Sequence, residues 1–470
     1  MVQLYAEQSS LLPGQSLTLR VSTTAPLFRV DFYRQGAAMT HIGDLGVPSN
    51  AGQQSPPHPS DQDWGVEGTD SNGQPLPGWK GYQFEIPADW PSGAYISIAT
   101  ELDSDGNPTS APNAASPDGR DAKALFVLNS SSPGARGSIL YKVPLFSYHA
   151  YNAAGDPPTC LYNGASAVSI RRPGGGTGAS PYDAGLYPDA YDPSSPRETF
   201  GHWDAPFIAW LEASGYQVDY CTDIDLHLGS PAFLEPYRLL LSVGHDEYWS
   251  PNMRANATAF VEGGGNVAFF AGNAVWKRVE FAAGGINFGF SGVWHELGEP
   301  ENTLTGVSYR NGGGQWEGPR PRVIGYTVQH ADSWVYQGSG LVDGQVFGDF
   351  YNGDPTDPAA LVGYECDGAH FDRAQLDHGG VIEPSHLDST PEGFVILGVA
   401  DLTGWQDFQA SGPGIGNMAA TMGYFERGGT VFTSGTSDWA RVLSSARSAP
   451  VETITRNVID SLSRLPHHRE

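Results

Sequence analysis

Short segments in which apolar and polar side chains alternate occupy much of the first 129 residues. This period of two is typical of strands with one buried face. Turn signals such as Pro13-Gly14 and Pro91-Ser92-Gly93 lie between the segments. Several short strands separated by such turns predict an Ig-like β-sandwich over residues 1–129. The predicted strands are residues 17–21, 28–33, 82–86, 95–98 and 124–128.

The pattern changes after residues 130–138, which are rich in Ser, Pro and Gly and are predicted to form a linker. Beyond them, continuous apolar runs alternate with amphipathic segments. This alternation predicts a doubly wound α/β domain over residues 139–470, interrupted by a mostly β stretch on long loops at 282–395. The predicted strands are 139–145, 216–221, 237–243, 266–270 and 429–433, and the predicted helices are 205–215, 250–262 and 451–465.

Composition narrows the classes of partner. The chain carries 52 acidic and 25 basic residues, and its net charge of −27 argues against nucleic acid and anionic membranes as partners. It contains no apolar run of about 18 residues that could span a membrane. The first ten residues do not resemble a signal peptide, so a cytoplasmic location is expected. Its three cysteines imply no disulfide framework. A homo-oligomer is compatible with these features.

Polar and aromatic side chains follow each predicted strand of the α/β domain. They occupy residues 146–152, 221–227, 244–249, 271–276 and 434–439. Ligands of open α/β sheets bind outside the carboxyl ends of the strands, so these segments predict one shared site.

The most distinctive of these segments is His245-Asp246-Glu247-Tyr248, which lies between a buried strand and a helix. A histidine and a carboxylate two residues apart on an extended turn can face the same cavity. The alternative is structural, with Asp246 or Ser250 capping the helix and His245 only hydrogen-bonded. Sequence patterns for other chemistries are missing: the chain has no HExxH, no GxSxG and no Walker motif.

Seven segments, in order along the chain, resemble those of the large (beta) subunit family of N,N-dimethylformamidase. They are residues 150–152, 161–162, 210–227, 242–250, 266–276, 363–367 and 435–440. The resemblance covers nearly the whole chain. It implies a β-sandwich followed by an α/β domain similar to glutamine amidotransferases.

The resemblance also implies one Fe³⁺ ion per chain, bound by two tyrosinates and a glutamate. Matching segment to segment places these ligands at Tyr151, Tyr162 and Glu247, with Tyr148 competing for the position of Tyr151. Fe³⁺ is a hard ion that favours anionic oxygen. A phenol with a pKa near 10 becomes a ligand only beside a strong Lewis acid.

Other site residues follow from the same match. His245 and Glu365 are expected to transfer protons, with Glu383 competing for the place of Glu365. The residues expected to contact substrate are Asn273, which would orient an amide, and Tyr248 and Trp276, which would form an apolar wall or else only pack helices. The sequence therefore predicts an iron-dependent hydrolase of a small N-substituted amide.

Two other functions stay open from sequence. One is a non-catalytic binding or recognition protein, with the sandwich as binding module and a degenerate α/β domain. The other is a sugar-processing enzyme that uses Asp223 and Asp225 as paired carboxylates. Compared with the family, residues 171–195 and 368–388 resemble inserted loops and are expected to reshape the pocket.

Overall fold

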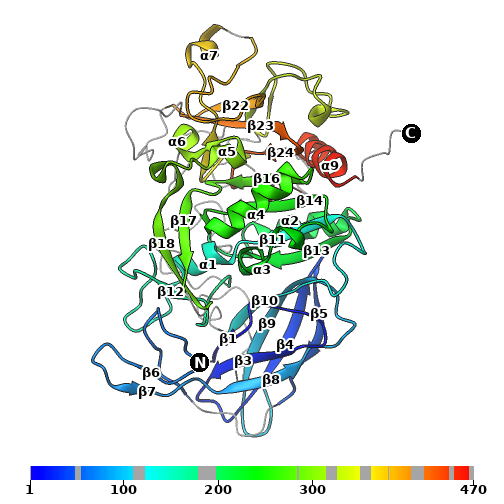
Figure 1. The fold of residues 1–470 in the computed structure, drawn as a ribbon. Coiled ribbons are helices and arrows are strands. Elements are labelled where there is room, and N and C mark those ends of the chain that lie inside the picture. Colours follow the sequence, from blue (N-terminus) through cyan, green and yellow to red (C-terminus); the bar gives the residue numbers. More distant parts are fainter. Residues whose placement is uncertain are drawn as a thin grey trace.

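The computed structural model shows several β-sheets accompanied by helices, which confirms a mixed β and α/β character (Figure 1). It describes residues 2–47, 54–109, 122–177, 197–282, 285–313, 325–349, 361–378, 380–403, 418–443 and 449–464. Within these ranges no helix has the length and apolar character needed to cross a membrane. The three cysteines are buried and unbridged.

Two sheets made by the first 128 residues pack face to face, and their blue ribbons lie at the bottom of Figure 1. One sheet has the order β1-β3-β8 and the other β2-β10-β9-β4-β5. Leu19 of the first and Phe32 of the second belong to one buried cluster between them. All five strands predicted here are present. The bounds are β1 Gln3–Ala6, β2 Ser10–Leu11, β3 Ser16–Ser22, β4 Leu27–Gln35, β5 Met39–Asp44, β6 Gly68–Thr69, β7 Pro75–Leu76, β8 Gly81–Glu85, β9 Gly93–Leu102 and β10 Lys123–Leu128.

The predicted linker, residues 130–138, contains no helix or strand and is mostly exposed. The sandwich nevertheless contacts the rest of the chain elsewhere. Ile96 and Leu125 belong to the same buried cluster as the core of the second part. An ion pair of 2.7 Å joins Arg34 to Glu212. Independent folding of residues 1–129 therefore stays a prediction.

A nine-stranded sheet organises the second part, with the order β13-β11-β14-β16-β24-β23-β22-β19-β20. Strands β13, β11, β14, β16 and β24 run parallel to one another and are called here the parallel half. The remaining strands pair antiparallel and form the antiparallel half. The bounds are β11 Ile139–Val143, β13 Val218–Thr222, β14 Leu239–His245, β16 Asn266–Gly272, β19 Tyr326–Val328, β20 Val346–Phe347, β22 Val395–Asp401, β23 Ala419–Arg427 and β24 Gly429–Thr433.

Helices cover both faces of the parallel half. Phe269 and Phe270 are neighbours in β16 and so point to opposite faces. The ring of Phe269 packs on Trp249, which precedes α4, whereas Phe270 packs on Phe207 of α2 and Trp439 of α8. Helices therefore pack against both faces of this half of the sheet. The bounds are α2 Asp204–Ala213, α4 Pro251–Glu262, α8 Trp439–Val442 and α9 Ala449–Ser463.

Two of the polar segments after strands turn out to be short helices, α1 Leu145–Tyr151 and α3 Asp223–Leu228. Strand β11 ends at Val143, two residues earlier than predicted, because Pro144 precedes the first turn of α1. Helix α3 begins after Thr222, whose side chain accepts a hydrogen bond from the backbone N–H of Asp225.

The prediction that residues 282–395 are mostly β is wrong for the residues described there. Loops and short helices predominate, because serine side chains cap them and glycines in left-handed conformation end them, as at Ser308 and Gly306. Strand β18 joins a separate sheet of order β12-β18-β17-β15. The remaining bounds are β12 Val168–Ser169, β15 Tyr248–Trp249, β17 Lys277–Phe281, β18 Asn287–Val293, β21 Cys366–Gly368, α5 Asn302–Thr305, α6 Tyr309–Gly312, α7 Ala374–His378, and the 3₁₀ turns Pro231–Phe233, Trp294–Leu297 and Trp334–Tyr336.

Candidate functional site

Three oxygens from separate elements converge beyond the carboxyl end of β14. The hydroxyls of Tyr151 and Tyr162 each lie 3.3 Å from Oε2 of Glu247. The two hydroxyls are also 3.3 Å apart, with their rings stacked at 4.6 Å. These are the three residues that the sequence nominates as metal ligands, and the fold brings them together. They are called here the oxygen triangle.

The turn after β14 presents its side chains alternately. Asp246 is buried and points away from the triangle, where it pairs with Lys142 at 2.8 Å and accepts from the Ser242 hydroxyl at 2.6 Å. Ser250, not Asp246, caps helix α4. Gly244 has a φ of +74°, and a Cβ there would lie 2.5 Å from Cβ of Trp203, so only glycine fits. The capping alternative therefore holds for Ser250 alone.

Helix α1 ends at Tyr151 and places its hydroxyl in the triangle. Its first turn is held by the Phe146 N–H, which donates to Asp223 Oδ2 at 2.7 Å. The competing Tyr148 faces elsewhere and donates its hydroxyl to Asp204. The structure therefore places Tyr151, and not Tyr148, beside Glu247.

Asp223 and Asp225 have structural partners. Asp223 pairs with the buried Lys142 at 2.5 Å. Asp225 closes the first turn of α3 and accepts from the Ser10 hydroxyl at 2.6 Å. These contacts account for both carboxylates, so the pair no longer supports a sugar-processing enzyme, for which the 12 Trp of the chain were the other indication.

His245 lies beside the triangle, with carboxylates at both ring nitrogens. Its Nε2 is 2.7 Å from Glu365 Oε2 and 3.2 Å from Glu247 Oε2. Its Nδ1 is 2.7 Å from Glu198 Oε2. The Asn273 side-chain amide lies 3.2 Å from Glu365 Oε2 and 3.4 Å from His245 Nε2. All five side chains are buried.

Burial and charge set the protonation of this cluster in the absence of a cation. Burial raises the pKa of Tyr151 and of Tyr162 well above 10, so both phenols would be neutral. Burial alone would lower the pKa of His245, but Glu198 and Glu365 outweigh it and hold that pKa well above 6.5. Burial would raise the pKa of Glu247, yet the bond from His245 dominates and lowers it.

Aromatic rings flank the triangle on one side. The hydroxyl of Tyr248 hydrogen-bonds that of Tyr162, and its ring stacks on Phe290 at 5.6 Å. Phe290 also meets the ring of Tyr162 edge-on at 5.4 Å. Trp276 instead packs on His295 and Tyr309. Tyr248 and Phe290, a residue not singled out from sequence, therefore lie beside the triangle, whereas Trp276 packs against other rings.

Backbone strain concentrates around His245. Glu198, Asn273, Val275 and Tyr364 all have positive φ, from 46° to 59°. Each such residue costs about 1–3 kcal/mol, which the surroundings must offset. Part of that support is visible at Asp367, whose carboxylate accepts from the backbone N–H groups of Asn273 and Ala274 at 3.0 Å each.

The sequence did not identify Glu198. It follows a segment without apolar periodicity, and its place beside His245 depends on a left-handed backbone. Of the two candidates Glu365 and Glu383, the structure brings only Glu365 to His245. Glu383 is exposed and bonds Gln375 through its backbone, whereas Glu365 is buried against His245.

The described residues include no group of three His, Cys, Asp or Glu side chains arranged for a metal ion. A metal at the triangle would depend on the two tyrosines.

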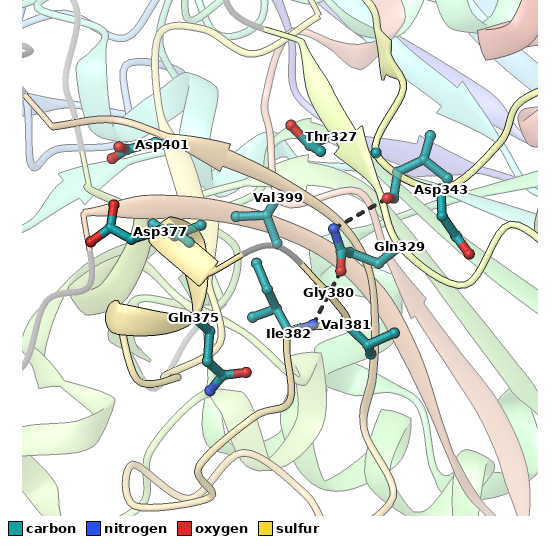
Figure 2. Close-up of a pocket in the computed structure, with 13 residues that line it drawn as sticks. Thr327, Gln329, Asp343, Gln375, Asp377, Gly380, Val381, Ile382, Val399 and Asp401 are labelled. Atoms are coloured by element: carbon teal, nitrogen blue, oxygen red, sulfur yellow. Dashed lines mark hydrogen bonds between the residues drawn. The ribbon is translucent and has the colours of Figure 1, made fainter.

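A cavity of about 540 Å³ lies in the antiparallel half of the sheet, and Figure 2 shows its lining. The predicted insertion 368–388 contributes Gln375 and Ile382 to it. None of the candidate site residues lines this cavity. The residues that the predicted insertion contributes to it therefore line a cavity separate from the candidate site. Most of the other insertion, from residue 178, lies outside the described residues.

Comparison with known proteins identifies a family. No curated protein matches the chain. A family model described as N,N-dimethylformamidase beta subunit-like, C-terminal, matches residues 24–453, which span the sandwich from its fourth strand and both halves of the sheet. The family points to a dimethylformamidase-like hydrolase, that is, an amidohydrolase. By this match, the chain belongs to the N,N-dimethylformamidase beta subunit-like family.

Proposed function

We propose that the chain is an iron-dependent amide hydrolase that acts on a small N-substituted, formamide-like amide. The observation that carries the proposal is the oxygen triangle with the His245–Glu365 pair beside it, 2.7 Å apart. The family membership supports the hydrolase class. The resemblance of the α/β part to glutamine amidotransferases belongs to the same proposal.

The triangle fits a small, hard cation. Its three oxygens are mutually 3.3 Å apart, and a protein metal–oxygen bond of roughly 2.0–2.2 Å lets one ion reach all three. Two phenolates and a carboxylate would supply three negative charges, which match Fe³⁺. Tyr151, Tyr162 and Glu247 would hold the ion. When bound, the ion supplies Lewis acidity toward a carbonyl oxygen and a water molecule.

His245 and Glu365 provide the proton transfers. Hydrolysis adds water across the amide C–N bond, so one proton must leave the water and one must reach the departing nitrogen. The imidazole and the carboxylate are within hydrogen-bond distance of each other and next to Glu247, so one can accept the first proton and the other donate the second. Asn273 contacts both and can orient the amide by hydrogen bonds.

Substrate size follows from the surroundings. The side chain of Tyr162 is 39% exposed, whereas its hydroxyl is desolvated among the other groups of the triangle, so the triangle lies close to the surface beside this ring. The rings of Tyr248 and Phe290 lie along that side and suit N-alkyl groups better than charged ones. Such rings also exclude water, which strengthens electrostatic interactions at the carbonyl.

A panel of formamides, acetamides and larger amides tests the proposal, with amine release as the readout and iron-loaded protein as the enzyme. Elemental analysis should give about one iron per chain, and tyrosinate-to-iron charge transfer should colour the protein. Stoichiometric zinc in place of iron would contradict the tyrosinate site. Iron-loaded protein that releases amine from none of these amides would favour the alternative of a binding or recognition protein.

A further inference from the structure

We infer that Glu198 is a positioning residue that fixes the ring of His245 through Nδ1. Both nitrogens of this imidazole face carboxylates, so the partner of one nitrogen fixes which groups the other nitrogen meets. With Nδ1 donating to Glu198 Oε2 at 2.7 Å, Nε2 is the nitrogen that faces Glu365 and Glu247. This role rests on the proposed function, because it depends on proton transfer by His245.

Glu198 is itself held firmly. Its second oxygen accepts from the Tyr364 hydroxyl at 3.3 Å, and the guanidinium of Arg197 lies 4.1 Å from the centre of the Tyr364 ring. Two adjacent residues therefore engage one tyrosine. The next residue after that tyrosine, Glu365, contacts Nε2 of His245. Tyr364 therefore supports Nδ1 of the imidazole through Glu198, and Glu365 contacts Nε2 directly.

Without Glu198, the other contacts of the His245 ring do not fix its orientation. The rings of Trp203 and Tyr364 lie 5.8 and 6.3 Å from it and limit its tilt. The polar partners Glu247, Glu365 and Asn273 all gather at Nε2. Glu198 is the described partner at Nδ1, and removing it would leave the ring free to turn about the Nε2 contacts.

Steady-state kinetics on the iron-loaded protein tests this role. Glu198→Ala should lower kcat by about 10²-fold with KM and iron content nearly unchanged, since proton transfer depends on orientation and Glu198 is not among the residues proposed to hold the ion or the substrate. Glu198→Gln, which can still accept from Nδ1, should lose less. Tyr364→Phe, which only loosens Glu198, should lose least. Glu301→Ala is the matched control, because Glu301 is equally buried and accepts from Ser308 instead.

Non-additivity distinguishes positioning from general damage. In a His245→Ala background, Glu198→Ala should cost no further activity, because Glu198 acts only through that ring. A further loss in the double variant, or a kcat for Glu198→Ala equal to that of Glu301→Ala, would overturn the role. Crystal structures of the wild type and Glu198→Ala decide the matter even if no amide proves to be a substrate. The ring should turn in the variant, and an unmoved ring would refute the inference.

Discussion

The two halves of the nine-stranded sheet place their polar side chains differently. At the carboxyl ends of the parallel half, His245 and Glu247 are buried and bonded to other buried groups. In the antiparallel half, the cavity is lined by carboxylates such as Asp377 and Asp401, of which Asp377 is exposed and Asp401 is half-buried (Figure 2). Parallel strands bring all their carboxyl ends to one edge, whereas antiparallel strands divide theirs between two. Convergence at one edge is what allows a dense, dry cluster.

Loss of a triangle residue should have the largest effect of any change discussed here. Glu247→Ala removes the only carboxylate of the triangle, and we expect iron to fall from about one per chain to none. Lewis acidity is worth several kcal/mol, so amide hydrolysis should fall by about 10³-fold or more. Elemental analysis and amine release measure both effects. Asp377→Ala, an acidic change in the cavity, should alter neither by more than about twofold. Full iron retention in Glu247→Ala would remove Glu247 from the metal site.

Loss of the histidine should separate metal binding from catalysis. His245→Ala should keep its iron, because His245 is beside the triangle rather than part of it. Its kcat should fall by about 10²–10⁴-fold, the usual contribution of a proton-transferring side chain. His330→Ala, just after β19 in the antiparallel half, is the control and should retain activity. If His245→Ala loses its iron in parallel with its activity, the ring is a ligand and the separation of roles is incorrect.

A pair of glycines compares the packing of the two halves. Gly244 in β14 and Gly344 near the cavity have φ of +74° and +79°, so alanine is strained similarly at both, by about 1–2 kcal/mol. A Cβ at Gly244 would lie 2.5 Å from Cβ of Trp203, whereas none of the described atoms lies within 4 Å of one at Gly344. Gly244→Ala should therefore destabilise by about 1–3 kcal/mol more. Denaturant unfolding of the two variants measures the difference in their free energies of unfolding. Equal destabilisation would mean that the Trp203 side chain moves aside at little cost.

The same comparison explains what the sequence could predict. Continuous apolar runs such as residues 239–243 identify central parallel strands, and the polar residues that follow them identified His245 and Glu247. The antiparallel half was harder. Strands β22 and β23 were not among the predicted strands, and the region 282–395 was predicted to contain more β structure than its described residues have.

Side-chain direction set the other limit. Spacing alone could not choose Tyr151 over Tyr148, because the choice depends on Asp204, which comes from a distant helix and binds Tyr148. Glu198 left no signal at all, because its contact with His245 depends on one residue in a left-handed conformation. Residues that function through tertiary contacts from irregular loops are those that periodicity cannot reveal.

The smallest expected effect concerns Asp401 at the edge of the cavity. Partial burial would raise the pKa of its carboxyl, but hydrogen bonds from Thr403 and Arg373 outweigh burial and hold that pKa below 3.8. A carboxyl with a lowered folded-state pKa stabilises the protein above its unfolded-state pKa, and this stabilisation is lost as the pH falls through the folded-state value. Both side chains are partly exposed, at 38% for Arg373 and 42% for Asp401, so solvent screens the pair. Asp401→Asn should therefore cost less than about 1 kcal/mol at pH 7, and the difference from wild type should shrink as the pH falls below 4. The free energy of unfolding of wild type and Asp401→Asn, measured at pH 7 and below pH 4, checks this expectation. Added salt should reduce the difference at pH 7, because it screens an exposed pair. A cost that exceeds the extra penalty of Gly244→Ala, or one that persists at low pH, would mean that the antiparallel half also depends on a buried polar network.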